Sequence, residues 1–262
     1  MVSALASRGV EAIAELIVKS RRTVALTGAG ISTESGIPDF RGPQGLWKRV
    51  DPKIGTIEFF MEHPDEFWRF QLDRLKEMMK AKPNRAHYAL AELEKMGKLS
   101  AVITQNVDGL HLKAGSKNVI EIHGNLRTAV CIRCKRVIPI EEALRLIESG
   151  VFPPKCEKCG SLLKTGSILF NEPIPEEALT RSYIEAETCD FMMAIGTSLQ
   201  VYPAAYLPVL AKRRSAKLAI INMEPTPLDD IADVVVHGKV GDVLESVLKL
   251  VKNMVEGRGQ RA

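Results

Sequence analysis

Two spacings of hydrophobic residues alternate along the chain. Val10, Ile13 and Ile17 lie three or four positions apart, and this spacing predicts an amphipathic helix over residues 9–20. The β-branched and apolar run from Thr23 to Thr27 follows and predicts a short buried strand. Comparable apolar runs occur at residues 101–104, 119–122, 191–195, 217–221 and 233–236. Helical spacing returns between most of these runs, at residues 84–96, 175–187, 203–214 and 241–255.

The alternation of strands and helices predicts an α/β fold class. Strands that are apolar throughout are typical of a parallel sheet that is covered on both faces, so we expect a Rossmann-like parallel sheet with helices on both sides. Three stretches would build this larger domain: residues 1–45, 84–127 and 166–262. Two insertions interrupt the alternation, a helical one at residues 46–83 and a cysteine-bearing one at residues 128–165. Together they would form a smaller domain.

Composition and charge narrow the class of protein. Of the 262 residues, 45% are hydrophobic and 26% are charged, which is ordinary for a globular protein. No apolar run approaches the roughly 20 residues of a membrane span, and a net charge of +4 is too small to indicate nucleic acid. Residues 1–8 lack the basic start and long apolar stretch of a secretory signal, so we expect a cytoplasmic protein with no membrane partner. The tail from Asn253 lacks apolar periodicity and is expected to fray.

Four of the five cysteines form two matched pairs. Two residues separate Cys131 from Cys134, two separate Cys156 from Cys159, and 21 lie between the pairs. This spacing lets the thiolates of each pair bind one tetrahedral ion, and the two pairs fill all four positions, so we predict one structural zinc ion per chain, a zinc ribbon. A redox-active pair or cytosolic disulfides are the alternatives. Cys189 precedes an apolar run and is predicted to be a buried, inert thiol.

A glycine-bearing loop follows the first predicted strand. Gly28 and Gly30 form half of a dinucleotide-binding pattern, in which glycines let the backbone approach a pyrophosphate. The complete pattern has a third glycine where Thr33 stands, and no acidic residue ends a second strand about 20 residues later. These departures argue against a hydride-transfer enzyme.

The whole loop and four later motifs together resemble one family. The loop has the sequence GAGISTESGIPDFR over residues 28–41. It is followed in order by TQNVDGLH at residues 104–111, by His123-Gly124, by the four cysteines and by GTSLQVYP at residues 196–203. From about residue 21 to residue 245 the chain resembles the sirtuins, NAD-dependent protein deacylases, of the prokaryotic type with a single catalytic core.

The resemblance implies an NAD-dependent protein-lysine deacetylase. Such an enzyme consumes NAD as a co-substrate: it cleaves nicotinamide from NAD and transfers the acyl group of acyl-lysine to ADP-ribose, which yields free lysine, nicotinamide and O-acetyl-ADP-ribose. The larger domain would bind NAD. The partners would be acetylated-lysine proteins, with chromatin proteins among the candidates, and no direct nucleic-acid binding is expected.

The resemblance also implies roles for individual residues. His123 would be the base that removes a ribose hydroxyl proton, for which an imidazole with a pKa near ~6.5 is suited, and Asn106 would order water and ribose. Asp108 and the Ile37 segment would hold the carboxamide of NAD, and Phe40 would shield the reacting centre. The cofactor-binding set would comprise Gly28, Ala29, Gly30, Ser32, Ile37, Asp39, Phe40, Arg41, Gln105, Asn106, Asp108, Gly196, Thr197, Ser198, Asn222, Glu224 and Asp242.

The substrate-binding set contains a departure from the family. The peptide-binding strand of sirtuins has Phe-Gly-Glu, whereas this chain has Phe170-Asn171-Glu172. Asn is the residue besides glycine that best tolerates a positive φ, so the backbone path can survive. The set would comprise Ile168, Phe170, Asn171, Glu172, Gln200, Val201, Gln71 and Arg74.

Gln71 and Arg74 stand where sirtuins that prefer succinyl or malonyl groups have Tyr and Arg. Because the tyrosine is absent and Asp73 is adjacent, we expect neutral acyl groups to be removed faster than succinyl. The alternative is that Arg74 is an exposed helix charge.

Several alternatives stay open. Protein mono-ADP-ribosyl transfer is one, because it begins with the same cleavage of NAD. Desuccinylation or demalonylation is another, because it would use the same site. A non-catalytic zinc-ribbon binder of nucleic acid is suggested by basic residues near the cysteines. Without the resemblance, Asn106 and Asp108 would be typical of a turn and His123 of a strand end. The remaining histidines are interpreted as ordinary surface or capping residues: His63, His87, His111 and His237.

Overall fold

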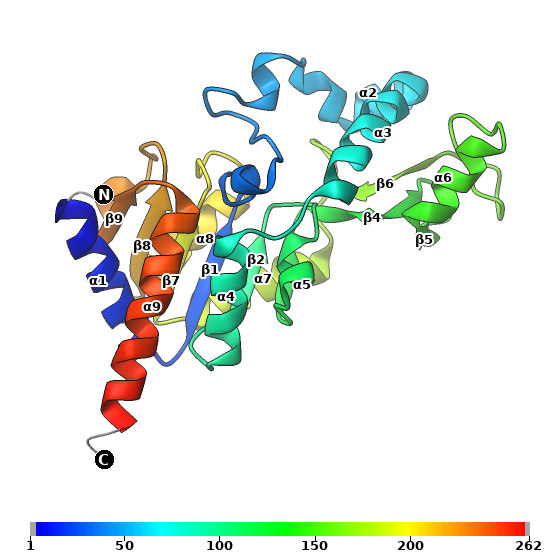
Figure 1. Ribbon diagram of the computed structural model, residues 1–262. Helices are drawn as coiled ribbons and strands as arrows, with labels where there is room; N and C mark the ends of the chain where they lie inside the picture. Colours follow the sequence, from blue (N-terminus) through cyan, green and yellow to red (C-terminus); the bar gives the residue numbers. More distant parts are fainter. Residues whose placement is uncertain (1–3, 260–262) are drawn as a thin grey trace.

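A six-stranded parallel sheet forms the centre of the computed structural model, which describes residues 4–259 (Figure 1). The strand order is β3-β2-β1-β7-β8-β9, and every neighbouring pair is parallel. The strands are β1 Thr23–Thr27, β2 Ala101–Thr104, β3 Val119–Glu121, β7 Phe191–Ile195, β8 Lys217–Asn222 and β9 Val234–His237. Each lies within one residue of a predicted apolar run, so the α/β class is confirmed.

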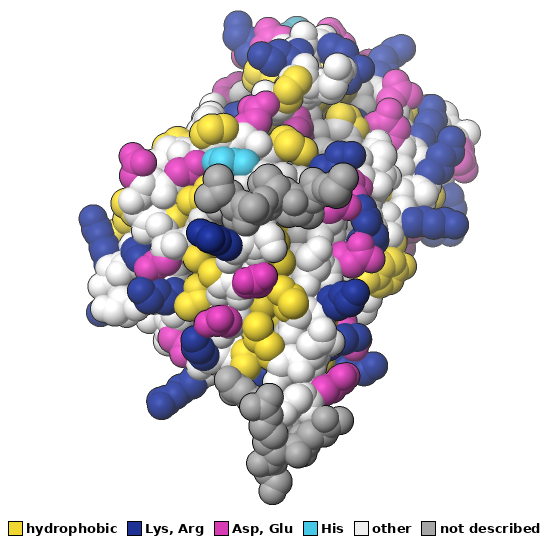
Figure 2. Space-filling view, turned by 60° about the vertical axis from the view of Figure 1, so that its left-hand side comes forward, with side chains coloured by type: hydrophobic (Ala, Val, Ile, Leu, Met, Phe, Trp, Pro, Cys, Tyr) yellow, Lys and Arg dark blue, Asp and Glu magenta, His cyan; other side chains and the backbone are white. Residues whose placement is uncertain are grey.

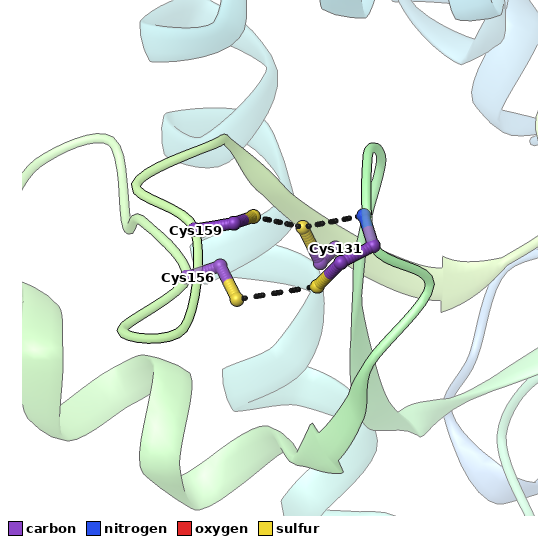
Figure 3. A group of neighbouring side chains, drawn as sticks. Cys131, Cys156 and Cys159 are labelled. Atoms are coloured by element: carbon purple, nitrogen blue, oxygen red, sulfur yellow. Dashed lines mark hydrogen bonds between the residues drawn. The ribbon is translucent and has the colours of Figure 1, made fainter.

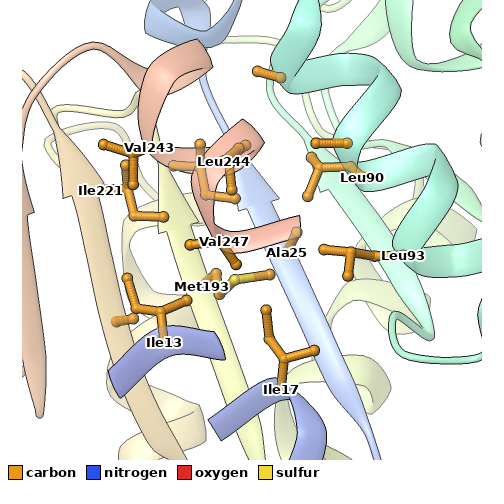
Figure 4. Packing of buried hydrophobic residues seen from close by; sticks show 14 of the residues in the cluster. Ile13, Ile17, Ala25, Leu90, Leu93, Met193, Ile221, Val243, Leu244 and Val247 are labelled. Carbon is orange, nitrogen blue, oxygen red and sulfur yellow. The ribbon is translucent and has the colours of Figure 1, made fainter. Parts of the chain in front are cut away.

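Helices cover both faces of this sheet, and the inner strands β1, β2 and β7 accordingly bury both sets of alternating side chains. Ala25 of β1 packs into a core with three helices, whereas Val24 and Leu26 pack into a second core on the opposite face. The first core contains α1 Ala4–Lys19, α4 Arg85–Lys95 and α9 Val240–Gly259; the second contains α7 Glu176–Thr188 and α8 Leu207–Arg213. Figure 4 shows the first core, where α1, α4 and α9 converge on Ala25 and Met193.

A second, three-stranded antiparallel sheet in the order β5-β4-β6 carries the cysteines. It consists of β4 Gly124–Cys131, β5 Val137–Pro139 and β6 Leu163–Ser167, and α6 Ile140–Glu148 packs against it. The helices α2 Ile57–Glu62 and α3 Pro64–Lys80 share its apolar core. Trp68 of α3 donates its indole N–H to the carbonyl of Leu163 over 2.8 Å, which joins the two insertions. We propose that this shared core is the small domain of residues 46–83 and 128–165.

Two expectations need correction, and one short helix was not predicted. The helical stretch expected at residues 46–80 is not continuous, because Pro52 and Pro64 each begin a new element: short 3₁₀ turns at Leu46–Lys48 and Pro52–Gly55 precede α2 and α3. The tail does not fray at Asn253, because α9 continues to Gly259 and Val251 and Met254 pack on the sheet core; residues 260–262 lie outside the described part. The motif at residues 104–111 also contains a short helix that the pattern missed, α5 Leu110–Ala114.

Within the described residues, no helix is both long enough and apolar enough to cross a membrane. On the face in Figure 2, basic and acidic side chains are intermingled over α1, α9 and the adjoining surface.

Candidate active site

A cavity of about 1020 Å³ opens at the carboxyl edge of the parallel sheet. Residues that directly follow β1, β2 and β7 line it, and the same cavity extends to the 3₁₀ turn and helix of the first insertion. Ligands bind at this edge in open parallel sheets. Every predicted catalytic, cofactor and substrate residue lines the cavity except Asp242.

The glycine loop lies directly against the end of β7. The Gly30 N–H donates to the Gly196 carbonyl over 2.8 Å, and a Cβ on Gly30 would lie 2.8 Å from that same oxygen. A Cβ on Gly28 would meet the Thr197 side chain at 2.7 Å. These contacts explain why both glycines are required even though the third glycine of the dinucleotide pattern is missing. From Ala29 to Ser35 the loop forms a 3₁₀ helix instead of the start of an α-helix.

Three polar side chains form a buried hydrogen-bonded chain on the cavity floor. The Asn106 amide donates to the Gly28 carbonyl over 3.1 Å and to the Ser32 hydroxyl over 3.2 Å. Ser32 in turn donates to Asp108 over 2.7 Å, and the other Asp108 oxygen accepts the Leu110 N–H over 2.8 Å. Burial raises the pKa of Asp108, and the hydrogen bonds from Leu110 and Ser32 oppose that shift. Asp108 therefore caps the backbone N–H of Leu110 and also lines the cavity.

His123 lies two residues beyond β3, and its ring is fixed by the backbone. Its Nδ1 lies 3.2 Å from the carbonyl oxygen of Gln105. Because that oxygen can only accept, Nδ1 carries the proton and Nε2 keeps its lone pair. Burial lowers the pKa of His123, and the hydrogen bond to Gln105 opposes the shift. The ring is therefore held as a neutral base.

The far end of the cavity is formed by β7, β8 and the start of α9. Gln105 donates its amide to the Thr197 hydroxyl over 2.9 Å, and Asn222 donates to the Glu224 carbonyl over 2.7 Å. Asp242, in contrast, does not line the cavity over the described residues, because its carboxylate binds Arg85 of α4 at 2.6 Å. Lys239 lines it instead. Asp242 thus lies outside the cavity that the other predicted residues line, and its contact with NAD stays a prediction.

Aromatic rings cover the opposite wall. Phe40 lies 5.1 Å from Trp47 between ring centroids, and Trp47 lies 6.4 Å from Phe170. Asp39 accepts the Gly42 N–H over 2.8 Å and so closes the loop that carries Phe40 and the exposed Arg41. Trp47 was missed by the sequence analysis, because it lies in the insertion and only folding places it between the other two rings.

The predicted substrate segment forms a tight turn beside His123. The Ile168 N–H donates to the His123 carbonyl over 2.8 Å, and the Glu172 N–H donates to the Leu169 carbonyl over 3.1 Å. Asn171, at the third position of that turn, has a φ of 68°. This confirms that asparagine supports the left-handed backbone where the family has glycine. Its amide also donates to Glu58 over 3.0 Å.

Gln71 and Arg74 reach the cavity from α3. The Arg74 guanidinium lies 5.6 Å from the centroids of both Phe40 and Phe70, and burial lowers its pKa to about 10. It is half-buried, so the alternative of an exposed helix charge is wrong. Gln71 is 2% exposed, and its Oε1 has no hydrogen-bond partner in the described structure.

The four paired cysteines converge at one end of the small sheet, and Figure 3 shows Cys131, Cys156 and Cys159 pointing toward one another. All four sulfurs lie within 4.8 Å of one another, with Cys131–Cys159 at 3.4 Å and Cys134–Cys156 at 3.7 Å. Tetrahedral zinc with Zn–S bonds of ~2.3 Å requires sulfurs roughly 3.8 Å apart. The donor set and its geometry therefore fit zinc. Cys189, 4% exposed, is buried as predicted, and burial raises its thiol pKa to about 12.

One of the remaining histidines confirms its interpretation and one corrects it. His87 completes the cap of α4, since its Nδ1 accepts the Asn84 N–H, and its side chain is fully buried. His111 is not a surface residue either: it is 2% exposed and its Nε2 lies 2.9 Å from the Thr27 hydroxyl. The two rings, one from α4 and one from α5, lie 4.9 Å apart between centroids.

Comparison with known proteins agrees with this geometry. The Sir2 family model matches residues 28–203. An NAD-dependent protein deacetylase of Caldivirga maquilingensis is 50% identical over 242 residues, which cover 92% of this chain and 93% of the relative. NAD-dependent protein deacetylase 1 of Pyrobaculum aerophilum is 51% identical over 246 residues, with 94% and 96% covered. A solved Sir2 variant with a deacetylated p53 peptide and 3′-O-acetyl ADP ribose is similar with a TM-score of 0.87 and 43% identity, over 91% of this chain and 97% of that one.

Proposed function

The chain belongs to the Sir2 family, and on this premise we propose that it is an NAD-dependent protein-lysine deacetylase. The observation that carries the proposal is the single cavity that joins the His123 base, the buried chain from Asn106 to Asp108 and the glycine loop. Relatives named as deacetylases share about half of their residues with this chain, and a Sir2 structure holds a deacetylated peptide beside an acetylated ADP-ribose.

When bound, NAD supplies the ADP-ribose that accepts the acyl group after nicotinamide leaves. Gly28 and Gly30 let the loop pack directly against Gly196 and Thr197, where a Cβ would clash, and this packing would present the loop backbone to the pyrophosphate. The residues around Gln105 and Thr197 would hold a ribose, and Lys239 lies at the end of the cavity where Asp242 was expected.

The protein groups around the reacting centre have distinct tasks. Nε2 of His123 takes a ribose hydroxyl proton, because Nδ1 is committed to the Gln105 carbonyl. Asn106 and Asp108 hold the nicotinamide ribose and the carboxamide, and Ser32 keeps both in register. Phe40 and Trp47 exclude water from this wall.

The acyl-lysine protein is bound by the segment from Ile168 to Glu172 together with Gln200 and Val201, all of which line the cavity. The substrates are acetylated-lysine proteins, among which chromatin proteins are one class to test. The four cysteines would hold a zinc ion that keeps the small sheet folded, and because their thiolates would fill all four positions it would perform no chemistry.

The direct test supplies an acetyl-lysine peptide with NAD and follows nicotinamide release, with mass spectrometry of the products. Deacetylation yields O-acetyl-ADP-ribose in solution and a peptide lighter by one acetyl group. A stable ADP-ribosyl adduct on protein, without loss of acetyl from the peptide, would support the transferase instead. Nucleic-acid binding without any NAD turnover would support the zinc-ribbon binder.

Acyl preference is set at the wall that holds Gln71 and Arg74. The guanidinium is stacked over Phe40 and Phe70 and no tyrosine hydroxyl accompanies it, so a succinyl carboxylate lacks one hydrogen-bond partner. A lost hydrogen bond to a charged group costs about 1.5–3 kcal/mol, so we expect kcat/KM for acetyl-lysine to exceed that for succinyl-lysine roughly ten- to a hundredfold. The comparison uses one peptide carrying either acyl group. A succinyl preference would contradict the assignment of Gln71 to the position of the tyrosine in succinyl-preferring sirtuins.

A further inference from the structure

Lys164 is a buried lysine that lies outside the cavity and outside the set of residues discussed so far. It belongs to β6, and its side chain is 7% exposed. Its ammonium donates to the Ser167 carbonyl over 2.7 Å and to the Thr165 carbonyl over 3.1 Å, and it lies 3.1 Å from the Glu172 carboxylate. A lysine ammonium has three donors, so these three acceptors satisfy it completely.

Glu172 extends this arrangement to the substrate segment. The oxygen that pairs with Lys164 also accepts the Leu169 N–H over 2.8 Å, and its side chain is 17% exposed. The ammonium and the carboxylate therefore bind the main chain on both sides of Ile168. One ion pair thus binds the substrate segment at Ser167, at Leu169 and at Glu172 itself.

Packing alone does not account for a lysine at this position. Burial lowers the pKa of Lys164, and the charge of Glu172 opposes that shift. Buried charges carry a desolvation cost that an apolar side chain of similar length would avoid. Unlike an apolar side chain, the ammonium fixes the positions of two carbonyl groups and one carboxylate, because all three accept from it.

The rest of the segment is held by other partners. The Ile168 N–H is bound to the carbonyl of His123, and Phe170 is hydrogen-bonded on both sides, to Gly55 and Ile57 of the first insertion. Between these anchors, the Ser167 carbonyl and the Glu172 side chain are held by Lys164. The distance between His123 and the turn that carries Asn171 therefore depends on the ion pair.

We propose that Lys164 is a positioning residue for the acyl-lysine peptide, which sets the path of Ser167–Glu172 relative to His123. This proposal rests on the proposed function, because it needs the segment to bind the peptide. Lys164 contacts neither the cavity floor nor the glycine loop, so it acts on the peptide and leaves NAD binding alone.

The test replaces Lys164 by methionine and measures KM for the acetyl-lysine peptide and for NAD separately. We expect KM for the peptide to rise about tenfold or more, in line with the loss of charge-assisted hydrogen bonds, with KM for NAD changed less than about twofold. Lys164→Arg retains the cation and its donors and should restore most of the peptide affinity. Lys19→Met, in an exposed pair with Glu15, is the matched control and should change neither KM.

A second variant separates positioning from stability. Lys164→Met leaves Glu172 buried without its cation and can lower the melting temperature, whereas the double variant Lys164→Met/Glu172→Gln removes both charges. We expect the double variant to regain the melting temperature but to keep the raised KM for the peptide.

The outcomes separate this inference from the proposed function. A folded Lys164→Met enzyme, or a folded double variant, with the wild-type KM for the peptide would overturn the positioning role, as would an equal rise of both KM values. A wild-type enzyme that does not deacetylate the peptide at all would overturn the proposed function itself.

Discussion

At the scale of single residues, the position of one proton decides what His123 can do. The Gln105 carbonyl takes the Nδ1 proton and leaves Nε2 as the free base, while burial keeps the ring neutral. The Asn106 amide donates to Gly28 and Ser32, and the Asp108 carboxylate accepts from Ser32 and Leu110, so the hydrogen bonds of both groups in the described structure go to partners other than the ring. Under the proposed function, proton transfer and NAD binding would therefore be carried by separate groups.

This separation predicts that His123→Ala loses turnover but keeps its affinity for NAD. We expect turnover to fall 10²–10⁴-fold, as is typical for a positioned acid–base group, while the affinity for NAD stays near the wild-type value. Steady-state kinetics and calorimetric titration with NAD measure the two effects. Retention of more than about a tenth of the wild-type rate would refute the role of the imidazole.

The lowered pKa of His123 also predicts the pH profile. The base is active when neutral, so its active form persists to a pH below the ordinary histidine pKa of about 6.5. We therefore expect the acid limb of kcat/KM to have its midpoint below pH 6.5. A midpoint at about 6.5 would show that the ring is solvated in the working enzyme, and one above that value that it faces a carboxylate.

At the scale of elements, the turn from Leu169 to Glu172 depends on its third residue. Asn171 holds a φ of 68°, a region that costs most residues roughly 1–2 kcal/mol, and it binds Glu58 of α2. Asn171 therefore stabilises the turn in two ways: it tolerates the positive φ, and its side chain binds the first insertion.

Two substitutions distinguish these contributions. Asn171→Ala should lower the free energy of unfolding by about 1–2 kcal/mol, because it keeps the positive φ without a tolerant side chain. Asn171→Gly removes the contact with Glu58 but relieves the backbone, and should lower stability by less. Urea denaturation of both variants measures the difference. Equal losses would place the whole effect in the contact with Glu58.

The predicted zinc site lies on the small sheet that joins the two insertions. The four cysteines hold the ends of β4 and β6, and the buried Trp68 of α3 is bound to Leu163 of β6. Chelation should therefore expose Trp68, shift its fluorescence to longer wavelength and abolish activity indirectly, and added zinc should reverse the shift. Fully active protein with far less than one zinc per chain would contradict this.

At the scale of the whole molecule, two neutral histidines are buried where the sheet meets its helices. Burial lowers the pKa of His87 to about 4 and of His111 to about 3, from about 6.5 in the unfolded chain. A folded pKa below the unfolded one means that the stabilisation is complete above pH 6.5. It is lost as the pH falls toward 4, because the unfolded chain then binds more protons.

The free energy of unfolding should therefore decrease by a few kcal/mol between about pH 6.5 and pH 4. His111→Gln, which can still bind the Thr27 hydroxyl but cannot be protonated, should flatten this decrease although it lowers stability at pH 7. Urea unfolding of both proteins at several pH values gives the comparison. Parallel profiles would mean that other groups dominate the acid sensitivity.

The sequence alone was sufficient for the features that depend on local spacing. The strands of the parallel sheet were predicted because each is a short run that is apolar throughout, and the helices because their apolar residues recur with a period of 3.6. The zinc ligands were predicted because two-residue spacing itself brings two thiolates together. Residues that follow a strand at the carboxyl edge, such as Asn106 and His123, were also placed, since parallel strands bring their ends together.

Tertiary structure decided the contacts between distant segments. Asp242 turns to Arg85 of α4 and leaves the cavity to Lys239, Trp47 comes to lie between Phe40 and Phe170, and Lys164 meets Glu172 across a turn. None of these follows from periodicity, because each depends on the rotation of a helix or the path of a turn relative to a neighbour. Such orientations are set by how side chains fill the space between elements, and that packing exists only in the folded chain.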